Sequence, residues 1–425
     1  MRLFISILLF SMPGALLASG PAGEFWPEWR GPLRTGVSAT ANPPLTWSST
    51  NNVRWKVATP GFGTSTPVVW DRKVFLLAAM PVGNPPPQGQ QQVHRFEVLC
   101  YDRNTGKQLW RRTVCEEAPH EGHHRDHGFA SASPITDGEL LLAYFGSRGL
   151  YCLNMDGAIQ WSKTLGKMRT RGRFGEGASP ALYGNTVVVN WDDETENDFL
   201  AAFDKRTGRE LWRVKRDEAT SWTTPLIVQY NGVSQVIVNA EKRVRSYNLA
   251  DGSELWQCGG QTANPIPTPV ASRDTVYVTS GFRGSAVFAI ALGKSGDLTG
   301  TDAVRWSRNK KTPYVPSPLL VDDLLYLATG NNPELTCLDA TTGAPHFEGE
   351  RFDGLSGIYA SPVSARDRVY ILGRNGTCIV LKKGPKPVEL ARNVLGEKTD
   401  ASIALAGRDL FIRTHESLYC LSESQ

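Results

Sequence analysis

Short apolar runs recur along the chain, and each begins with a small residue followed by proline. The seven starts are Thr66-Pro67, Ser133-Pro134, Ser179-Pro180, Thr224-Pro225, Thr268-Pro269, Ser317-Pro318 and Ser361-Pro362, and Ala401-Ser402-Ile403 is an eighth without the proline. From Pro134 to Pro362 the spacing is 44 to 49 residues. Because proline has no N–H to give to a sheet, it suits the first residue of a strand. A period of this length indicates a repeat architecture.

Each unit continues with the same order of apolar and polar segments. An apolar strand follows the proline, a polar turn comes next, and a Val/Tyr-rich strand follows, as at 275–279, 324–328 and 368–372. A glycine-containing loop then leads to a third strand, a tight turn and a fourth strand. No stretch shows sustained helical periodicity. Four short strands per unit at this interval predict the four-stranded antiparallel blades of a β-propeller.

The tight turn before the fourth strand carries the most regular motif. Residues 102–110 read Asp-Arg-Asn-Thr-Gly-Lys-Gln-Leu-Trp, and 204–212 have the same form. Variants occupy 154–161, 248–256 and 339–347, the last with Phe in place of Trp. Aspartate or asparagine begins an Asx-type turn, and glycine takes the position with positive φ. We predict that the tryptophan lies at the contact between neighbouring blades.

The strand starts give seven complete blades and one partial blade. The partial unit, residues 402–421, has no tryptophan strand, and the segment 52–57 near the N-terminus supplies one. Pairing these two segments closes the ring and removes an exposed sheet edge. The sequence therefore predicts an all-β, eight-bladed propeller in a single domain, residues 19–425. Seven blades is the alternative.

The Asp-x-x-Thr-Gly-x-x-x-Trp turn and the Ser-Pro strand start resemble the repeat of pyrroloquinoline-quinone (PQQ)-type propellers, over roughly residues 29–421. That group includes quinoprotein alcohol dehydrogenases and the propeller lipoprotein of the Bam complex. The resemblance implies the fold, and it raises PQQ with Ca²⁺ as a cofactor. Such dehydrogenases often have two adjacent cysteines, and this sequence has none. It also lacks a Cys-x-x-Cys-His haem attachment motif.

The first residues have the pattern of an export signal. Arg2 precedes an apolar run at 3–10, and small residues at 15–18 form a cleavage zone. The apolar run is too short to span a bilayer, and no other long apolar segment follows. We expect residues 1–18 to be removed and the mature chain to be soluble, in the periplasm or outside the cell.

Charge and cysteine usage narrow the possibilities further. A formal net charge of +4 over 425 residues gives no case for nucleic-acid binding. Four of the seven cysteines hold equivalent places in different units, which a repeat keeps too far apart to bridge. We predict that these four are small buried apolar side chains: Cys100, Cys152, Cys337 and Cys420. The pairing of Cys115, Cys258 and Cys378 stays open.

Two sets of loops meet at one end of a propeller, namely those that lead into first strands and those that join second and third strands. Aromatic and basic residues gather in these loops and predict a funnel that suits an anionic or planar ligand. The predicted ligand-binding residues are Arg148, Arg171, Trp222, Arg243, Arg283, Tyr314, Tyr359 and Arg374. The alternative for each is a ring packed on its blade or a solvated charge. An acidic loop at 191–198 either pairs with these arginines or takes Ca²⁺, although it lacks EF-hand spacing.

A histidine-rich segment at 120–127 contains a literal His-Glu-x-x-His. Zinc proteases need that spacing on a helix, whereas Pro119, Gly122 and the β surroundings disfavour one. A simple Zn²⁺ or Cu²⁺ site is the remaining metal hypothesis, and its ligands are His120, His123, His124 and His127. The alternative is a polar loop whose imidazoles form hydrogen bonds on the loop face.

These features favour an exported, monomeric propeller that acts as a binding or scaffolding module through its loop-rich face. A cell-envelope protein or a small anionic ligand is the expected partner. The alternative is a small quinoprotein or metal-dependent oxidoreductase that uses the same face. Enzymatic activity is disfavoured because local motifs give no complete catalytic set, and the sequence assigns no cofactor.

Overall fold

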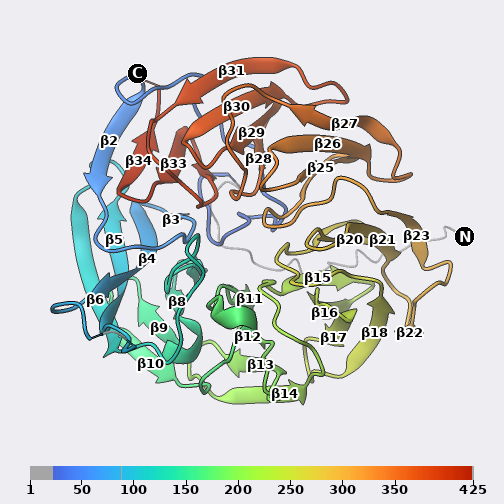
Figure 1. The fold of residues 1–425 in the computed structure, drawn as a ribbon, viewed down its shortest axis with the longest axis horizontal. Helices are drawn as coiled ribbons and strands as arrows, with labels where there is room; N and C mark the ends of the chain where they lie inside the picture. The colour runs from blue at the N-terminus through green and yellow to red at the C-terminus, as the bar shows by residue number, and fades with distance from the viewer. Residues whose placement is uncertain (1–22, 88, 424–425) are drawn as a thin grey trace, which may run out of the picture.

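The computed structural model describes residues 23–87 and 89–423. The predicted signal segment 1–18 lies outside these residues, so its removal stays a prediction. In the described residues the secondary structure is strands plus two short 3-10 turns, η1 (Gly146–Arg148) and η2 (Arg171–Arg173). No helix in this part of the chain is long and apolar enough to cross a membrane. The strands form eight sheets arranged around one axis (Figure 1), which confirms the predicted eight-bladed propeller.

The first four blades follow one another in chain order, each from its inner to its outer strand. Blade 1 contains β3 (Val68–Trp70), β4 (Lys73–Pro81), β5 (His94–Asp102) and β6 (Gln108–Glu117). Blade 2 contains β7 (Ile135–Thr136), β8 (Leu140–Tyr144), β9 (Leu150–Asn154) and β10 (Ile159–Lys163). Blade 3 contains β11 (Ala181–Tyr183), β12 (Thr186–Trp191), β13 (Phe199–Asp204) and β14 (Glu210–Lys215). Blade 4 contains β15 (Leu226–Tyr230), β16 (Val233–Val238), β17 (Arg243–Asn248) and β18 (Glu254–Gly259).

The remaining blades complete the circle. Blade 5 contains β19 (Val270–Ser272), β20 (Thr275–Ser280), β21 (Ala286–Ala291) and β23 (Val304–Arg308). Blade 6 contains β24 (Leu319–Val321), β25 (Leu324–Ala328), β26 (Glu334–Asp339) and β27 (Pro345–Arg351). Blade 7 contains β28 (Val363–Ala365), β29 (Arg368–Leu372), β30 (Thr377–Lys382) and β31 (Glu389–Val394). Blade 8 contains β32 (Ala404–Ala406), β33 (Asp409–Arg413) and β34 (Ser417–Leu421), with β2 (Val53–Ala58) as its outer strand.

Strands from outside the repeat complete three of the sheets. The N-terminal β2 pairs antiparallel with β34, with Trp55 opposite Cys420. This is the predicted ring closure, and Figure 1 shows it as a blue strand beside a red one. Strand β1 (Val37–Ser38) adds to β28 in parallel, and β22 (Gly296–Asp297), from the insertion in blade 5, adds to β18 in parallel.

Tryptophans on outer strands dock onto the tight turn of the next blade, as predicted. Each of these docking tryptophans donates its Nε1–H to a backbone carbonyl of that turn. The donor–acceptor pairs are Trp55 and Arg103 (2.8 Å), Trp110 and Met155 (3.1 Å), Trp161 and Lys205 (2.8 Å), Trp212 and Leu249 (2.8 Å), and Trp306 and Ala340 (2.9 Å). The indole lies flat on the turn glycine, so that a Cβ at Gly208 would come within 2.8 Å of Trp161. The glycine is therefore required both for its φ of 68° and for the space above it.

The junctions without a docking tryptophan are filled in other ways. Trp256 donates within its own blade, to Gln235 Oε1 at 3.1 Å. Blade 7 has no tryptophan on its outer strand, and Trp47 from the N-terminal segment stacks on Tyr370 there, with ring centroids 6.3 Å apart. The Trp47 backbone N–H also donates to Asn393 Oδ1 at 2.7 Å. A residue from outside the repeat thus takes the place of the missing one.

The small residue before each strand start is always serine or threonine, and these hydroxyls join consecutive blades around the axis, from blade 1 to blade 8. In each pair the backbone N–H of one residue donates to the hydroxyl oxygen of its counterpart in the next blade, at 2.8–3.2 Å. The series is Thr66, Ser133, Ser179, Thr224, Thr268, Ser317, Ser361 and Ser402. A hydroxyl is needed because a buried N–H without an acceptor is costly.

The cysteines are free in the structure, six of them buried and Cys115 half-buried. The four at equivalent repeat positions are buried apolar side chains, as predicted. Burial is also the main reason that the pKa of the Cys100 thiol is raised to about 12. The described chain contains no disulfide between Cys115, Cys258 and Cys378.

The N-terminal segment 24–38 closes one end of the axis. Arg30 is buried there and donates to the carbonyls of Pro318 at 2.9 Å and Pro362 at 3.2 Å. Arg34 donates to the carbonyls of Leu182 at 2.7 Å and Ile227 at 3.3 Å, on blades 3 and 4. One segment therefore connects opposite sides of the ring, and the axis can open only at the other face.

Candidate functional site

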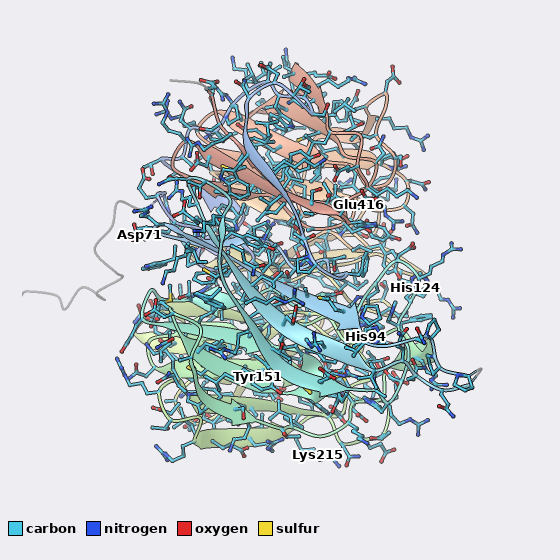
Figure 2. The ribbon with its side chains drawn as sticks, turned by 90° about the vertical axis from the view of Figure 1, so that its left-hand side faces the viewer. Asp71, His94, His124, Tyr151, Lys215 and Glu416 are labelled. Carbon is cyan, nitrogen blue, oxygen red and sulfur yellow. The ribbon has the colours of Figure 1, made fainter. Side chains whose placement is uncertain are left out.

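An axial cavity of about 600 Å³ is lined by loops of the open face, and Trp29 of the N-terminal segment lies at its floor. Figure 2 shows the two faces edge-on, with Asp71, in the turn between β3 and β4, on one side and His124 on the other. The lining side chains come from the two loop sets that the sequence singled out, and every blade contributes at least one. Its volume falls in the range of about 300–1,000 Å³ that is typical of small-molecule sites.

Hydroxyl and aromatic side chains occupy different parts of this lining. Blades 8, 1, 2 and 3 supply the hydroxyl arc, which consists of Thr64, Thr66, Ser133, Ser179 and Ser402. Blades 3 to 7 supply the aromatic wall, which consists of Phe174, Trp222, Phe282, Tyr314 and Tyr359, with Ile266 and Val315 between them. Hydroxyl side chains therefore gather on one side of the cavity and aromatic rings on the other, where Asn331 and Arg374 stand among the rings.

Four of the predicted ligand-binding residues line the cavity: Trp222, Tyr314, Tyr359 and Arg374. The Arg374 guanidinium lies 3.9 Å from the centre of the Tyr359 ring. It also pairs with Asp400 at 2.6 Å and with Asp126 at 3.1 Å. Burial alone would lower the pKa of Arg374, but the bonds to these carboxylates outweigh it and raise the pKa. Arg374 is thus a fixed cation whose charge two carboxylates already balance.

The other four predicted arginines lie outside the cavity, where nearby groups engage them. Arg148 is buried and pairs with Glu176 at 2.7 Å. Arg171 pairs with Glu241 at 2.5 Å and with Glu194 at 3.4 Å. Arg243 lies 3.5 Å from Asp217, and the exposed Arg283 lies against the ring of Phe282. The structure therefore does not bring these four together as a cationic funnel.

The acidic loop at 191–198 pairs with arginines, which is one of the two alternatives that the sequence leaves open. Asp192 forms a fully buried ion pair with Arg216, at 2.7 Å. Ser221 and Asn190 donate to the same carboxylate, and Glu194 pairs with Arg171. This loop is held in place by cations of the chain itself.

The histidine-rich segment is a loop, as the proline and glycine indicated, and its imidazoles make separate contacts. His120 Nε2 lies 2.6 Å from the Met168 carbonyl, and His127 Nδ1 lies 2.5 Å from Ser131 Oγ. His123 Nδ1 lies 2.8 Å from the His124 carbonyl. No three His, Cys, Asp or Glu side chains in the described part of the chain are grouped to hold a metal ion. Metal binding at these four histidines stays a prediction.

Residues 118–131, termed the bridging loop, reach across the cavity mouth. The loop leads into blade 2, and its Asp126 pairs with Arg374 on the loop between β29 and β30 of blade 7. Glu121 fixes its base by accepting hydrogen bonds from the backbone N–H and the hydroxyl of Thr170. His127 is a half-buried residue of this loop, and the removal of solvent from its imidazole lowers its pKa to about 4. The bridging loop is thus tied at two points, Glu121 and Asp126, and its His127 imidazole is neutral near neutral pH.

Comparison with known proteins places this architecture in a family. A family profile described as outer membrane protein assembly factor BamB matches residues 94–348, more than half of the chain. The chain belongs to this family of PQQ-type propellers. Membership supports a binding or scaffolding role at the level of the family. A search of curated proteins found no match.

Solved structures share the fold with this member of the BamB-type family at low sequence identity. BamB from Moraxella catarrhalis has 12% identity and a TM-score of 0.56, over 82% of this chain and 99% of that chain. The computationally designed Ika8 protein has 13% identity and a TM-score of 0.59, over 86% and 98% of the two chains. Quinohemoprotein alcohol dehydrogenase from Comamonas testosteroni has 11% identity and a TM-score of 0.64, over 95% and 81%.

The cavity lining does not fit the Ca²⁺ and quinone pair that the PQQ resemblance raises. The carboxylates in the lining are Asp126 and Asp400, and Arg374 engages both. A cation at this place would have to compete with that guanidinium for both of its anionic ligands. No cysteine is among the lining residues. We therefore derive no chemistry through a quinone at this site.

Several lining residues were not predicted from the sequence. Trp29 lies in a segment without repeat features. Asp126 pairs with Arg374 far along the chain, and Asp400 pairs with the same arginine from the next blade. The hydroxyl arc does have a signal in the sequence, because a serine or threonine stands at every strand start.

Proposed function

We propose that this propeller is an exported binding module that engages its partner through the loop face around the axial cavity. The observation that carries the proposal is the asymmetry of the axis. One end is closed by the buried segment 24–38, whereas the other is an open cavity lined by non-repeating side chains from all eight blades. Because binding residues are concentrated on loops held by a rigid scaffold, the open end is the face for recognition.

The partner we propose is a protein of the cell envelope. The export signal predicted at 1–18 and membership of a family described as an outer-membrane assembly factor both support this assignment. Arg125, at the cavity rim, is exposed and makes no ion pair among the described residues, so it is free to contact a partner.

Site-specific photo-crosslinking in the cells that produce the chain tests this proposal. A photoreactive residue replaces Arg125 at the rim, and the control places the same residue at Lys107, an exposed cation in the turn between β5 and β6 on the opposite face. We expect a discrete adduct with one envelope protein from position 125 and none from position 107. Equal adducts from both positions, or no adduct from position 125, would overturn the choice of face.

A further inference from the structure

The hydroxyl arc lines the cavity with residues that are themselves 1–5% exposed, Thr64 apart. The oxygens of Ser133, Ser179 and Ser402 accept backbone N–H groups at 2.8–2.9 Å. A serine hydroxyl still has its own proton to donate, and none of these three hydroxyls donates to an acceptor within the described chain. The Nε1–H of Trp29 also donates to Ser402 Oγ, at 3.3 Å, so that this oxygen accepts two hydrogen bonds. A ligand that meets this side therefore needs acceptor oxygens spread along an edge.

The aromatic wall lines the cavity across from these donors, with one face of the Tyr359 ring covered by the Arg374 guanidinium at 3.9 Å. Phe282 and Tyr314 stack on each other with centroids 5.1 Å apart, and both are only partly buried. The Tyr359 hydroxyl donates to Asn331 Oδ1 at 2.8 Å, which fixes the orientation of its ring. Aromatic faces carry partial negative charge and attract polarised C–H groups. A ligand that meets this side needs an apolar or C–H-bearing face.

The charges in the lining cancel. Two arginines, Arg125 and Arg374, stand against two aspartates, Asp126 and Asp400. Because Arg374 is held by both aspartates, an anionic ligand would have to break those pairs to reach it. Arg125, unpaired among the described residues, lies at the rim, so the body of the cavity favours an uncharged ligand.

We propose that the axial cavity binds a neutral saccharide. A pyranose ring combines a C–H face with an edge of hydroxyl and ether oxygens, which matches the wall and the arc at the same time. The volume of about 600 Å³ suits an oligosaccharide rather than a single ion or water cluster. This inference rests on the proposed function in assigning recognition to the loop face, and it deepens it by naming a ligand class.

Calorimetric titration with soluble trisaccharides tests the inference directly. The neutral probes are chitotriose, cellotriose, maltotriose and mannotriose, and trigalacturonate is the charged comparison. We expect saturable binding of at least one neutral probe and weaker binding of trigalacturonate. Tyr314→Ala should weaken the binding about tenfold, as expected for the loss of one aromatic contact from a small ligand.

Two variants make the readout specific. Tyr314→Phe keeps the ring and should bind like the wild type, because the Tyr314 hydroxyl has no hydrogen-bond partner among the described residues. Tyr230→Ala removes a half-buried ring from the end of β15, next to the turn into β16 on the opposite face, and should leave binding unchanged. Saccharide binding that Tyr314→Ala leaves intact, or that Tyr230→Ala weakens equally, would place the ligand elsewhere and refute the inference.

The outcomes also separate this inference from the proposed function. No binding of any neutral probe at millimolar concentration, together with an adduct from position 125, refutes the saccharide and leaves the envelope partner. Saccharide binding without an adduct supports the cavity ligand and refutes the protein partner. Binding of trigalacturonate as tight as that of the neutral probes refutes the neutral class.

Discussion

Substituting Gly208 by alanine should destabilise the propeller more than an ordinary turn substitution, because two costs coincide at this position. Gly208 has a φ of 68°, and a non-glycine residue in this left-handed region costs roughly 1–2 kcal/mol. An added Cβ would also lie 2.8 Å from two ring atoms of Trp161. Real Cβ atoms essentially never come this close to another heavy atom. The indole of Trp161 must therefore move.

The second cost is the free energy that is lost when the Trp161 indole is displaced from the turn. The Nε1–H of Trp161 donates to the Lys205 carbonyl at 2.8 Å, and such a bond contributes about 0.5–1.5 kcal/mol. Moving the ring also exposes apolar surface, at about 25 cal/mol per Å². Together with the backbone cost, we expect Gly208→Ala to lower the free energy of unfolding by about 2–4 kcal/mol.

Gly184→Ala is the matched control in the same blade. Gly184 also has a positive φ, 57°, but nothing lies within 4 Å of the Cβ position. This variant should lose only the backbone term of about 1–2 kcal/mol. The difference between the two variants therefore isolates the docking of Trp161 on the turn.

Equilibrium urea unfolding followed by far-UV circular dichroism measures this difference, provided that the slope with urea is unchanged between variants. Trp161→Phe, which keeps an aromatic ring and removes the Nε1–H, should lie between the wild type and Gly208→Ala. Equal midpoints for Gly208→Ala and Gly184→Ala would show that the docking tryptophan adds no stability, and the account of the blade junction would then be wrong.

Three further predictions concern other parts of the chain. Asp192→Asn leaves the fully buried Arg216 without its carboxylate and should cost about 3–5 kcal/mol in urea unfolding, whereas Glu139→Gln at an exposed pair should cost less than about 1 kcal/mol. The pKa of His127 is about 4 in the folded chain and about 6.5 in the unfolded chain. Its contribution to the free energy of unfolding is therefore constant above about pH 6.5, and it falls by about 3 kcal/mol as the pH drops toward 4. His127→Gln should remove that part of the acid sensitivity, and an unchanged pH profile of the midpoint would contradict the assignment. Mass spectrometry of the chain from its native cells should find the mature N-terminus near Ser19, and a retained Met1 would exclude the export signal.

The repeat made the fold predictable from the sequence. Thr66-Pro67 and its six counterparts marked the first strand of each blade, and residues 102–110 marked the turn between the third and fourth strands. Both signals are local, so their spacing determined the number of blades and the closing strand without any knowledge of long-range contacts. The same signals identified the face of the cavity, and Trp222, Tyr314 and Tyr359 lie there because they precede strand starts.

The charge distribution in the site was not predictable in the same way. A loop position indicates which face a side chain lies on but not which partner it meets. Arg148 is engaged by Glu176, 28 residues away along the chain, and Arg374 by Asp126, on a loop from another blade. Such pairs depend on how neighbouring loops fold over the blades, which no local motif encodes. The sequence predicts an anionic or planar ligand, and it gives no sign of the carboxylates that already balance Arg374.

The N-terminal segment shows how a lapse in a repeat can itself be informative. Its last part, β2, was predictable because Trp55 has the features of a repeat tryptophan. The earlier part was not, because Trp29 at the cavity floor and Trp47 at the blade 7 junction match no repeat position. Yet blade 7 lacks its tryptophan, and an unfilled junction would leave a void that close-packed protein interiors do not tolerate. The absence of that residue therefore implies that something outside the repeat must fill the gap, and an aromatic residue in the segment next to the closing strand is the nearest candidate along the chain.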